Sequence, residues 1–117
     1  MRVLFDNGTP RGVASALAEH TVDEARAHGW DTFRNGELLD AAEAAGFDVF
    51  ITTDRNIPYQ QNLRNRRIAI VVLGSGRWRL IRERLQQISA AVSAAQPGRV
   101  TEVEIPVPGD PASRDGR

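Results

Sequence analysis

Residues 49–54 read Val-Phe-Ile-Thr-Thr-Asp, an apolar run that closes on two threonines and a carboxylate. A second apolar run, Ile68 to Leu73, follows it along the chain. Neither run alternates between apolar and polar residues, as the strands of a half-exposed sheet do. Unbroken runs of this kind are typical of strands covered on both faces of a parallel sheet. The two segments therefore predict an α/β fold with a mostly parallel central sheet.

The segments around these runs supply the other expected elements. Strands are expected at residues 3–5, 21–25, 49–53, 68–73 and 100–105, and helices at 9–19, 35–45 and 78–95. The last helix has the most regular spacing of three and four residues between apolar positions. Alternation of strands with helices predicts a three-layer sandwich over residues 1–105. The Pro- and Gly-rich residues 106–117 predict a flexible C-terminal tail.

Two helix starts are marked by residues that favour capping. Thr9-Pro10 combines an N-cap residue with a proline at the first helical position. Asn35 is the expected N-cap of the second helix, and Gly46 stands where a left-handed glycine often ends one.

The composition excludes several kinds of site. The 117 residues include no cysteine and only two histidines. Disulfide bonds, thiolate zinc sites and cysteine nucleophiles are therefore excluded, and a histidine-rich metal site is not expected. No apolar run reaches the roughly 18 residues of a membrane span, so we expect no membrane partner. The chain runs from Met1 directly into a strand without a signal-peptide pattern, and we expect a cytoplasmic protein.

Charge is balanced over the chain but not along it. Residues 1–54 hold ten acidic residues and four Arg, whereas residues 55–99 hold nine Arg and one acid. Guanidinium groups suit phosphate oxygens, so a polyanion could bind the basic part. The candidates for phosphate contacts are Arg55, Arg64, Arg66 and Arg67. A solvated, Arg-rich surface is the alternative explanation for each of them.

Three carboxylates are expected at one edge of the sheet. Asp6 follows the first strand, Asp54 follows the strand at 49–53, and Glu37 lies in the first turn of the preceding helix. Crowded carboxylates repel one another unless a cation neutralises them, and hard oxygen ligands favour Mg²⁺ or Mn²⁺ over zinc. Such an ion can activate water and stabilise charge on a phosphodiester. The pattern therefore predicts a metal site formed by Asp6, Glu37 and Asp54.

Each acid also has a structural alternative. Asp6 could cap the turn through Asn7-Gly8, and Glu37 could complement the dipole of its own helix. Asp54 could cap a short helix that begins near Pro58. Trp30 and Phe33 could stack on RNA bases or pack in the core, and Trp78 could lie in the core or in a homodimer contact.

Three segments resemble the small PIN-like family, which is related to the PIN-domain ribonucleases and to toxins of bacterial toxin–antitoxin pairs. They are Leu-Phe-Asp-Asn with Thr-Pro in residues 4–10, Asn-Gly-Glu-Leu-Leu at 35–39 and Ile-Thr-Thr-Asp-Arg-Asn at 51–56. The resemblance covers about residues 1–75 and is most specific at Thr-Thr-Asp-Arg-Asn. It implies a three-layer α/β fold, an acidic Mg²⁺ or Mn²⁺ pocket and single-stranded RNA as the substrate.

The same resemblance implies roles for individual residues. Asp6 and Asp54 match two acids of the family, whereas Asn35 and Asn56 stand where many members have acids. The implied catalytic and metal-binding set is Asp6, Glu37 and Asp54, with Asn7, Asn35 and Asn56 as hydrogen-bond partners around it. The implied protein is an endoribonuclease, in some members a toxin held by a cognate antitoxin.

The alternative function is a PIN-like module that binds RNA or protein without catalysis. Amides bind divalent ions more weakly than carboxylates do, and Asn35 and Asn56 motivate this alternative. A phosphoacceptor receiver domain is not expected, because the chain lacks Lys and lacks paired acids after the first strand.

Overall fold

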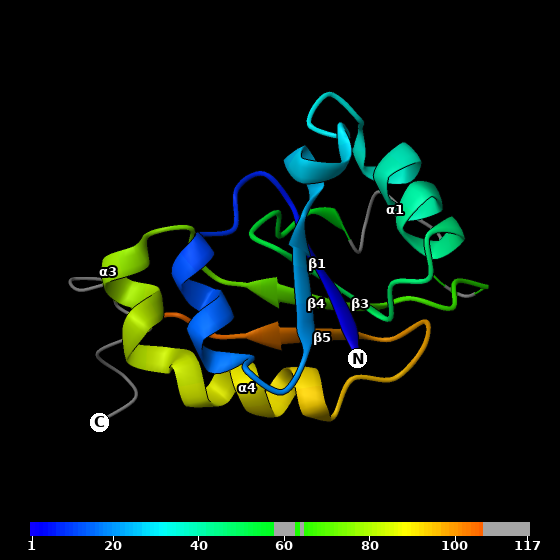
Figure 1. Cartoon of the computed structure of the whole chain (residues 1–117). Helices are drawn as coiled ribbons and strands as arrows, with labels where there is room; N and C mark the ends of the chain where they lie inside the picture. Colours follow the sequence, from blue (N-terminus) through cyan, green and yellow to red (C-terminus); the bar gives the residue numbers. More distant parts are fainter. Residues whose placement is uncertain (58–62, 64, 107–117) are drawn as a thin grey trace.

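The computed structural model describes residues 1–57, 63 and 65–106. These residues form one sheet of five parallel strands in the order β2-β1-β3-β4-β5 (Figure 1). The strands are β1 Arg2–Phe5, β2 Thr21–Glu24, β3 Val49–Thr52, β4 Ala69–Leu73 and β5 Val100–Val103. The α-helices are α1 Asn35–Ala44, α3 Trp78–Ile81 and α4 Leu85–Ser93, and the 3-10 helices are η1 Arg11–Ala16, η2 Ala25–His28 and η3 Arg82–Arg84. The predicted α/β fold with a parallel central sheet is confirmed.

Burial follows the position of each strand in the sheet. Every residue of β3 and β4 is buried, whereas β2 and β5, at the two edges, are only partly buried. The register pairs Phe5 with Ile51 and Thr52 with Val72. The carboxyl ends of β1, β3 and β4 therefore meet at one edge of the sheet, where open α/β sheets usually bind ligands.

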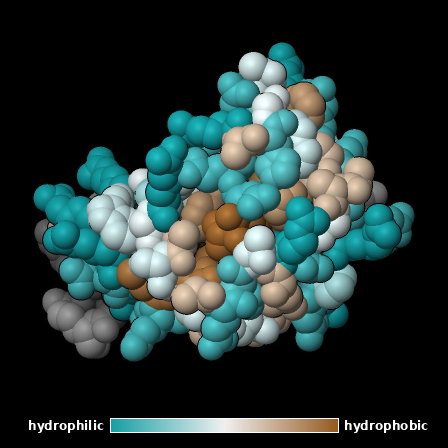
Figure 2. Space-filling view, viewed as in Figure 1, coloured by the Kyte–Doolittle hydropathy of each residue, from teal (hydrophilic) through white to brown (hydrophobic). Residues whose placement is uncertain are grey.

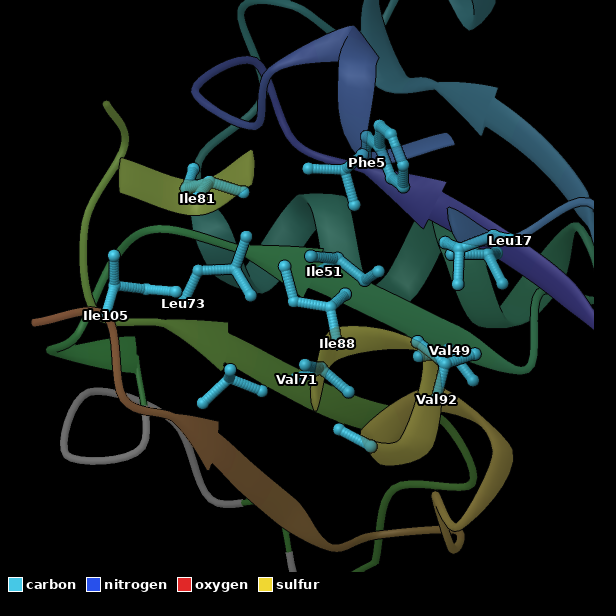
Figure 3. Packing of buried hydrophobic residues seen from close by; sticks show 14 of the residues in the cluster. Phe5, Leu17, Val49, Ile51, Val71, Leu73, Ile81, Ile88, Val92 and Ile105 are labelled. Carbon is cyan, nitrogen blue, oxygen red and sulfur yellow. The ribbon is translucent and has the colours of Figure 1, made fainter. Parts of the chain in front are cut away.

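Side chains that alternate along the strands fill two hydrophobic cores, one on each face of the sheet. Phe5, Ile51 and Leu73 point to the face covered by η1, α3 and α4, where they pack with Ile88 (Figure 3). The opposite face is covered by α1, and its core contains Leu4, Leu38, Leu39, Ala42, Phe50 and Ile70. Helices thus cover both faces of the sheet, as a three-layer sandwich requires.

Two predicted helices differ from those observed. The helix expected at 9–19 is the shorter 3-10 helix η1, with Pro10 and not Thr9 at the N-cap, because the Thr9 side chain contacts Asp6 and Ile51 instead. The helix expected at 78–95 is divided into α3, η3 and α4. Arg84 leaves the helical region there, with φ −124° and ψ 22°, which interrupts the regular ladder.

The ends of α1 show one correction and one confirmation. Arg34 is the N-cap, and Asn35 is the first helical residue. Gly46 adopts a left-handed conformation with φ 85° directly after the helix, as predicted.

Trp78 joins α3 to η1. Its ring lies over Gly12, where a Cβ atom would be 2.4–2.7 Å from three ring atoms. Only glycine fits this close approach, and Trp78 keeps part of its surface exposed.

The surface in the view of Figure 2 is mostly hydrophilic, with a hydrophobic area near its centre, between η1 and β2. Within the described part of the chain, no helix is long and apolar enough to span a membrane. The Pro58-Asn62 segment, Arg64 and the predicted tail beyond Pro106 lie outside the described residues.

Candidate functional site

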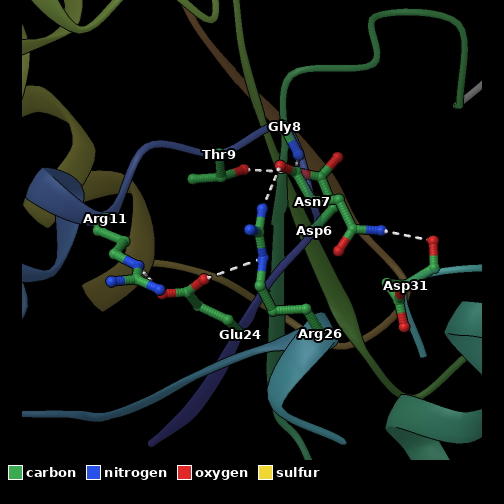
Figure 4. A network of polar contacts seen from close by, with 8 residues as sticks. All are labelled: Asp6, Asn7, Gly8, Thr9, Arg11, Glu24, Arg26 and Asp31. Carbon is green, nitrogen blue, oxygen red and sulfur yellow. Dashed lines mark hydrogen bonds and ion pairs between the residues drawn. The ribbon is translucent and has the colours of Figure 1, made fainter. Parts of the chain in front are cut away.

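Asp6 follows β1 and is held in place by donors on both of its carboxylate oxygens. Its backbone N–H continues the sheet by donating to the Ile51 carbonyl at 3.1 Å. Oδ1 accepts the Gly8 N–H at 3.2 Å and lies 2.6 Å from the Thr9 hydroxyl (Figure 4). Oδ2 accepts the Thr52 hydroxyl at 2.5 Å. The predicted turn cap through Gly8 is therefore present, but it uses only part of the carboxylate.

Thr52, the last residue of β3, connects the two aspartates. Its side chain is fully buried, and its hydroxyl donates to Asp6 while accepting the backbone N–H of Asp54 at 3.0 Å. Since β1 and β3 are neighbours, one buried hydroxyl holds the segments that follow both strands. Asp6 and Asp54 consequently lie at the same edge of the sheet.

Asp54 is also bound through both carboxylate oxygens. Oδ1 accepts the backbone N–H of Asn56 at 2.9 Å, and Oδ2 accepts the side-chain amide of Asn35 at 2.8 Å. Asn35, at the start of α1, is therefore a direct partner of Asp54, and Asn56 takes part through its backbone. The first helical residue of α1 thus contacts the segment that follows β3.

Glu37 does not join this pair in a common cluster. It is exposed, and its Oε1 accepts the Arg34 backbone N–H at 3.2 Å at the start of α1. Because the helix begins at Asn35, Glu37 occupies the third helical position, from which a glutamate reaches back to the N-cap. No group of three or more acidic or histidine side chains that could hold a metal ion exists within residues 1–57, 63 and 65–106. The predicted three-carboxylate site is thus not formed by these residues.

Asp6 and Asp54 form no ion pair with an Arg, Lys or His side chain in the described part of the chain. Their hydrogen-bond partners there are two hydroxyls, a side-chain amide and two backbone N–H groups, all of them neutral. A carboxylate offers about four lone-pair positions, and here Asp6 uses three and Asp54 uses two. Mg²⁺ is commonly held by one or two carboxylates, with water and substrate phosphate as further ligands. Two anionic oxygen groups with free lone pairs fit that chemistry.

Arg66 is engaged elsewhere. Its Nη1 atom lies 2.6 Å from Asp40 and 2.7 Å from Glu43, and its side chain is 16% exposed. Glu43 also accepts the backbone N–H groups of Arg67 at 2.6 Å and Ile68 at 3.3 Å. These residues precede β4, so they lie at the amino edge of the sheet, away from Asp6. Arg66 braces α1 against β4 and is not placed to bind phosphate beside the aspartates.

The contacts between α1 and the segment before β4 determine the protonation of Glu43 and Arg66. Burial by itself would raise the pKa of Glu43, but the Arg66 hydrogen bond, the two backbone donors and the Arg66 charge outweigh it and lower the pKa. Burial would likewise lower the pKa of Arg66, yet its bonds to Glu43 and Asp40 leave that pKa raised. Both groups are therefore charged at neutral pH.

Two arginines that the charge pattern did not single out are held by Glu24, and one of them contacts Asn7, the residue after Asp6. Glu24, at the end of β2, holds Arg11 at 2.7 Å and Arg26 at 3.5 Å, and Arg26 also donates to the Asn7 carbonyl at 3.3 Å (Figure 4). One indication of this position was present in the sequence, because Arg26 directly follows the strand predicted at residues 21–25. Arg55 is exposed directly after Asp54, and Arg67 is exposed at the amino edge.

Comparisons with protein-family models, curated proteins and solved structures give no match for this chain. The PIN-like resemblance accordingly stays a prediction that rests on the three quoted segments. The described geometry consists of two aspartates without ion pairs among the described residues, connected by Thr52 at the carboxyl edge of a parallel sheet.

Proposed function

We propose that the chain is an Mg²⁺- or Mn²⁺-dependent endoribonuclease that cleaves single-stranded RNA, with Asp6 and Asp54 holding the ion. One observation carries this proposal. Asp6 and Asp54 follow neighbouring strands at the carboxyl edge of the sheet, both bind Thr52, and all the described partners of their carboxylates are neutral donors. Placing two negative charges together is unfavourable, and a divalent cation would relieve the cost. Glu37 is assigned to the start of α1 and not to the ion.

The residues around the pair orient it. Thr9, Gly8 and Thr52 fix the plane of the Asp6 carboxylate, and Asn35 fixes that of Asp54. A bound ion would supply Lewis acidity to a phosphodiester and to an attacking water. Arg55 is exposed next to Asp54, and we assign to it a contact with a phosphate of the substrate. A toxin role, an antitoxin partner, a homodimer and a cytoplasmic location remain predictions from sequence.

The second candidate is a PIN-like module that binds RNA or protein without cutting. It is favoured by the amide of Asn35, which occupies Asp54 Oδ2, and by Glu37, which turns to the backbone of Arg34. Both features remove oxygen ligands that a three-acid site would have. This module would bind its partner equally well with and without divalent ions.

The test is cleavage of a fluorescein-labelled single-stranded RNA with Mn²⁺ or Mg²⁺, with EDTA as the metal-free control. Asp6→Asn and Asp54→Asn should each lower the rate by about 100-fold or more, since the electrostatic role of a metal is worth several kcal/mol. Glu102→Gln, an equivalent change on the exposed edge strand β5, should cut like wild type. Binding without cleavage, unaffected by EDTA, selects the second candidate. A wild-type protein that neither cuts nor binds RNA excludes the nuclease and the RNA-binding form of the second candidate, and leaves its protein-binding form.

A further inference from the structure

Three rings in the segment after β2 form a stack. His28 lies 4.5 Å from Trp30 with an interplanar angle of 22°, and Trp30 lies 6.3 Å from Phe33 at 14°. Phe47 meets His28 and Trp30 edge-on and closes the stack from the protein side. Trp30 is half-buried against the core, whereas Phe33 is 37% exposed at the other end. The outermost ring is therefore supported from one side and open to solvent.

This stack is fastened to the candidate site. The Asn7 side chain donates to the Asp31 carbonyl at 3.0 Å, two residues before Phe33 (Figure 4). Asn35, two residues after Phe33, donates to Asp54. Figure 1 shows the same segment, between η2 and α1, projecting beyond the carboxyl ends of β1 and β2. Phe33 thus lies between Asp31 and Asn35, which contact the segments that follow β1 and β3.

A cationic group lies on the other side of Asn7. The Arg26 guanidinium donates to the Asn7 carbonyl, contacts Glu24 and keeps 56% of its side chain exposed. Glu24 is shared with Arg11, so these three side chains carry a net positive charge. A guanidinium has five N–H donors, and the two contacts of Arg26 leave several for a phosphate.

We propose that Phe33 and Arg26 hold an unpaired stretch of polynucleotide beside Asp6, with one base stacked on the Phe33 ring and a neighbouring phosphate on Arg26. Proteins that bind single strands combine these two elements, aromatic faces for bases and basic groups for the backbone. The assignment of the strand as a substrate rests on the proposed nuclease function, but the binding itself does not. It needs neither a metal ion nor cleavage.

The test is fluorescence anisotropy of a labelled single-stranded oligonucleotide of about 12 nucleotides, in EDTA. Phe33→Leu should weaken binding about tenfold, whereas Phe33→Tyr, which keeps a ring, should bind like wild type. Arg26→Gln should weaken binding several-fold and reduce its salt dependence by about one phosphate contact. Arg99→Gln, at the amino edge, is the matched control and should have no such effect. Far-UV circular dichroism verifies that each variant is folded.

The outcomes separate the two proposals. Ring-dependent binding by a protein that cuts no RNA rejects the nuclease function and supports this inference. Cleavage by a protein whose Phe33→Leu and Arg26→Gln variants bind and cut like wild type rejects the inference alone. A wild-type protein that does not bind the oligonucleotide, or that binds the matching duplex with the same dependence on Phe33, also overturns it.

Discussion

Two pairs of acidic residues, one pair at each edge of the sheet, have different kinds of partner. At the amino edge, Asp40 and Glu43 share the guanidinium of Arg66, so opposite charges neutralise one another in place. At the carboxyl edge, Asp6 and Asp54 are oriented by neutral hydroxyl and amide donors and form no ion pair among the described residues. The first arrangement stabilises the fold, whereas the second leaves two carboxylates available to a ligand. Residues at sites that bind ligands are commonly not optimised for stability.

The largest expected effect on stability is at the amino edge. Glu43→Gln should lower the free energy of unfolding by about 2–3 kcal/mol, because charge-assisted hydrogen bonds are lost and Arg66 is left with the exposed Asp40 as its one described ion-pair partner. Urea unfolding at neutral pH measures it. Arg82→Gln removes an exposed cation whose only described ion pair is a 3.9 Å contact, and it should change the urea midpoint very little.

The pH dependence of the same variant checks the cause. The pKa of Glu43 is lowered in the folded protein, so its stabilising contribution is present above the unfolded pKa and is lost as the pH falls through the folded pKa. The difference between wild type and Glu43→Gln should therefore shrink when unfolding is measured from pH 7 down to about pH 3. An undiminished difference in acid would mean that packing and not charge explains the loss.

Thr52 should give the next largest effect, at the carboxyl edge. Thr52→Val keeps the shape of the buried side chain but removes the hydroxyl that serves Asp6 and Asp54. We expect a loss of about 1–2 kcal/mol, because the Asp54 N–H is left without its acceptor. Thr52→Ser keeps the hydroxyl and should retain the metal response described below, whereas Thr52→Val should weaken it. Equal metal responses in both variants would show that metal binding by the two aspartates does not depend on the Thr52 hydroxyl.

A smaller effect is expected from divalent ions themselves. Mn²⁺ at ten times its dissociation constant should stabilise the wild-type protein by about 1.4 kcal/mol, and EDTA should reverse the change. Thermal unfolding with increasing Mn²⁺ measures it. The response should disappear in Asp6→Asn and persist in Glu43→Gln, since the proposed ion lies at Asp6 and Asp54 and Glu43 is paired with Arg66 at the other edge. A response that survives in Asp6→Asn would place the ion elsewhere.

The layers of the fold could be predicted from sequence, because hydrophobic runs report local burial. Residues 49–51 and 68–73 are apolar without interruption, and β3 and β4 are indeed buried on both faces. The shape of the long last helix could not be predicted in the same way. Its apolar spacing continues through residues 82–84, where the backbone of Arg84 leaves the helix.

The candidate site was harder to predict, because it depends on contacts between residues far apart in the chain. Helix α1 begins one residue earlier than predicted, with Arg34 and not Asn35 at the N-cap. With this start, Glu37 caps the helix and Asn35 contacts Asp54. From the sequence alone, Arg66 looks like a cation without a partner. Its two partners, Glu43 and Asp40, lie 23 and 26 residues earlier, on one face of α1. Neither arrangement leaves a local pattern.

The smallest expected effect is the most discriminating one. In EDTA, Asp54→Asn should change the free energy of unfolding by less than about 1 kcal/mol. An amide of the same shape can still accept the Asn56 N–H, and Asp54 has no ion pair among the described residues for the change to break. Urea unfolding beside Glu43→Gln compares the two edges directly. If Asp54→Asn proved as damaging as Glu43→Gln without metal, the carboxylate of Asp54 would be a structural group like that of Glu43, and the contrast between the edges would be lost.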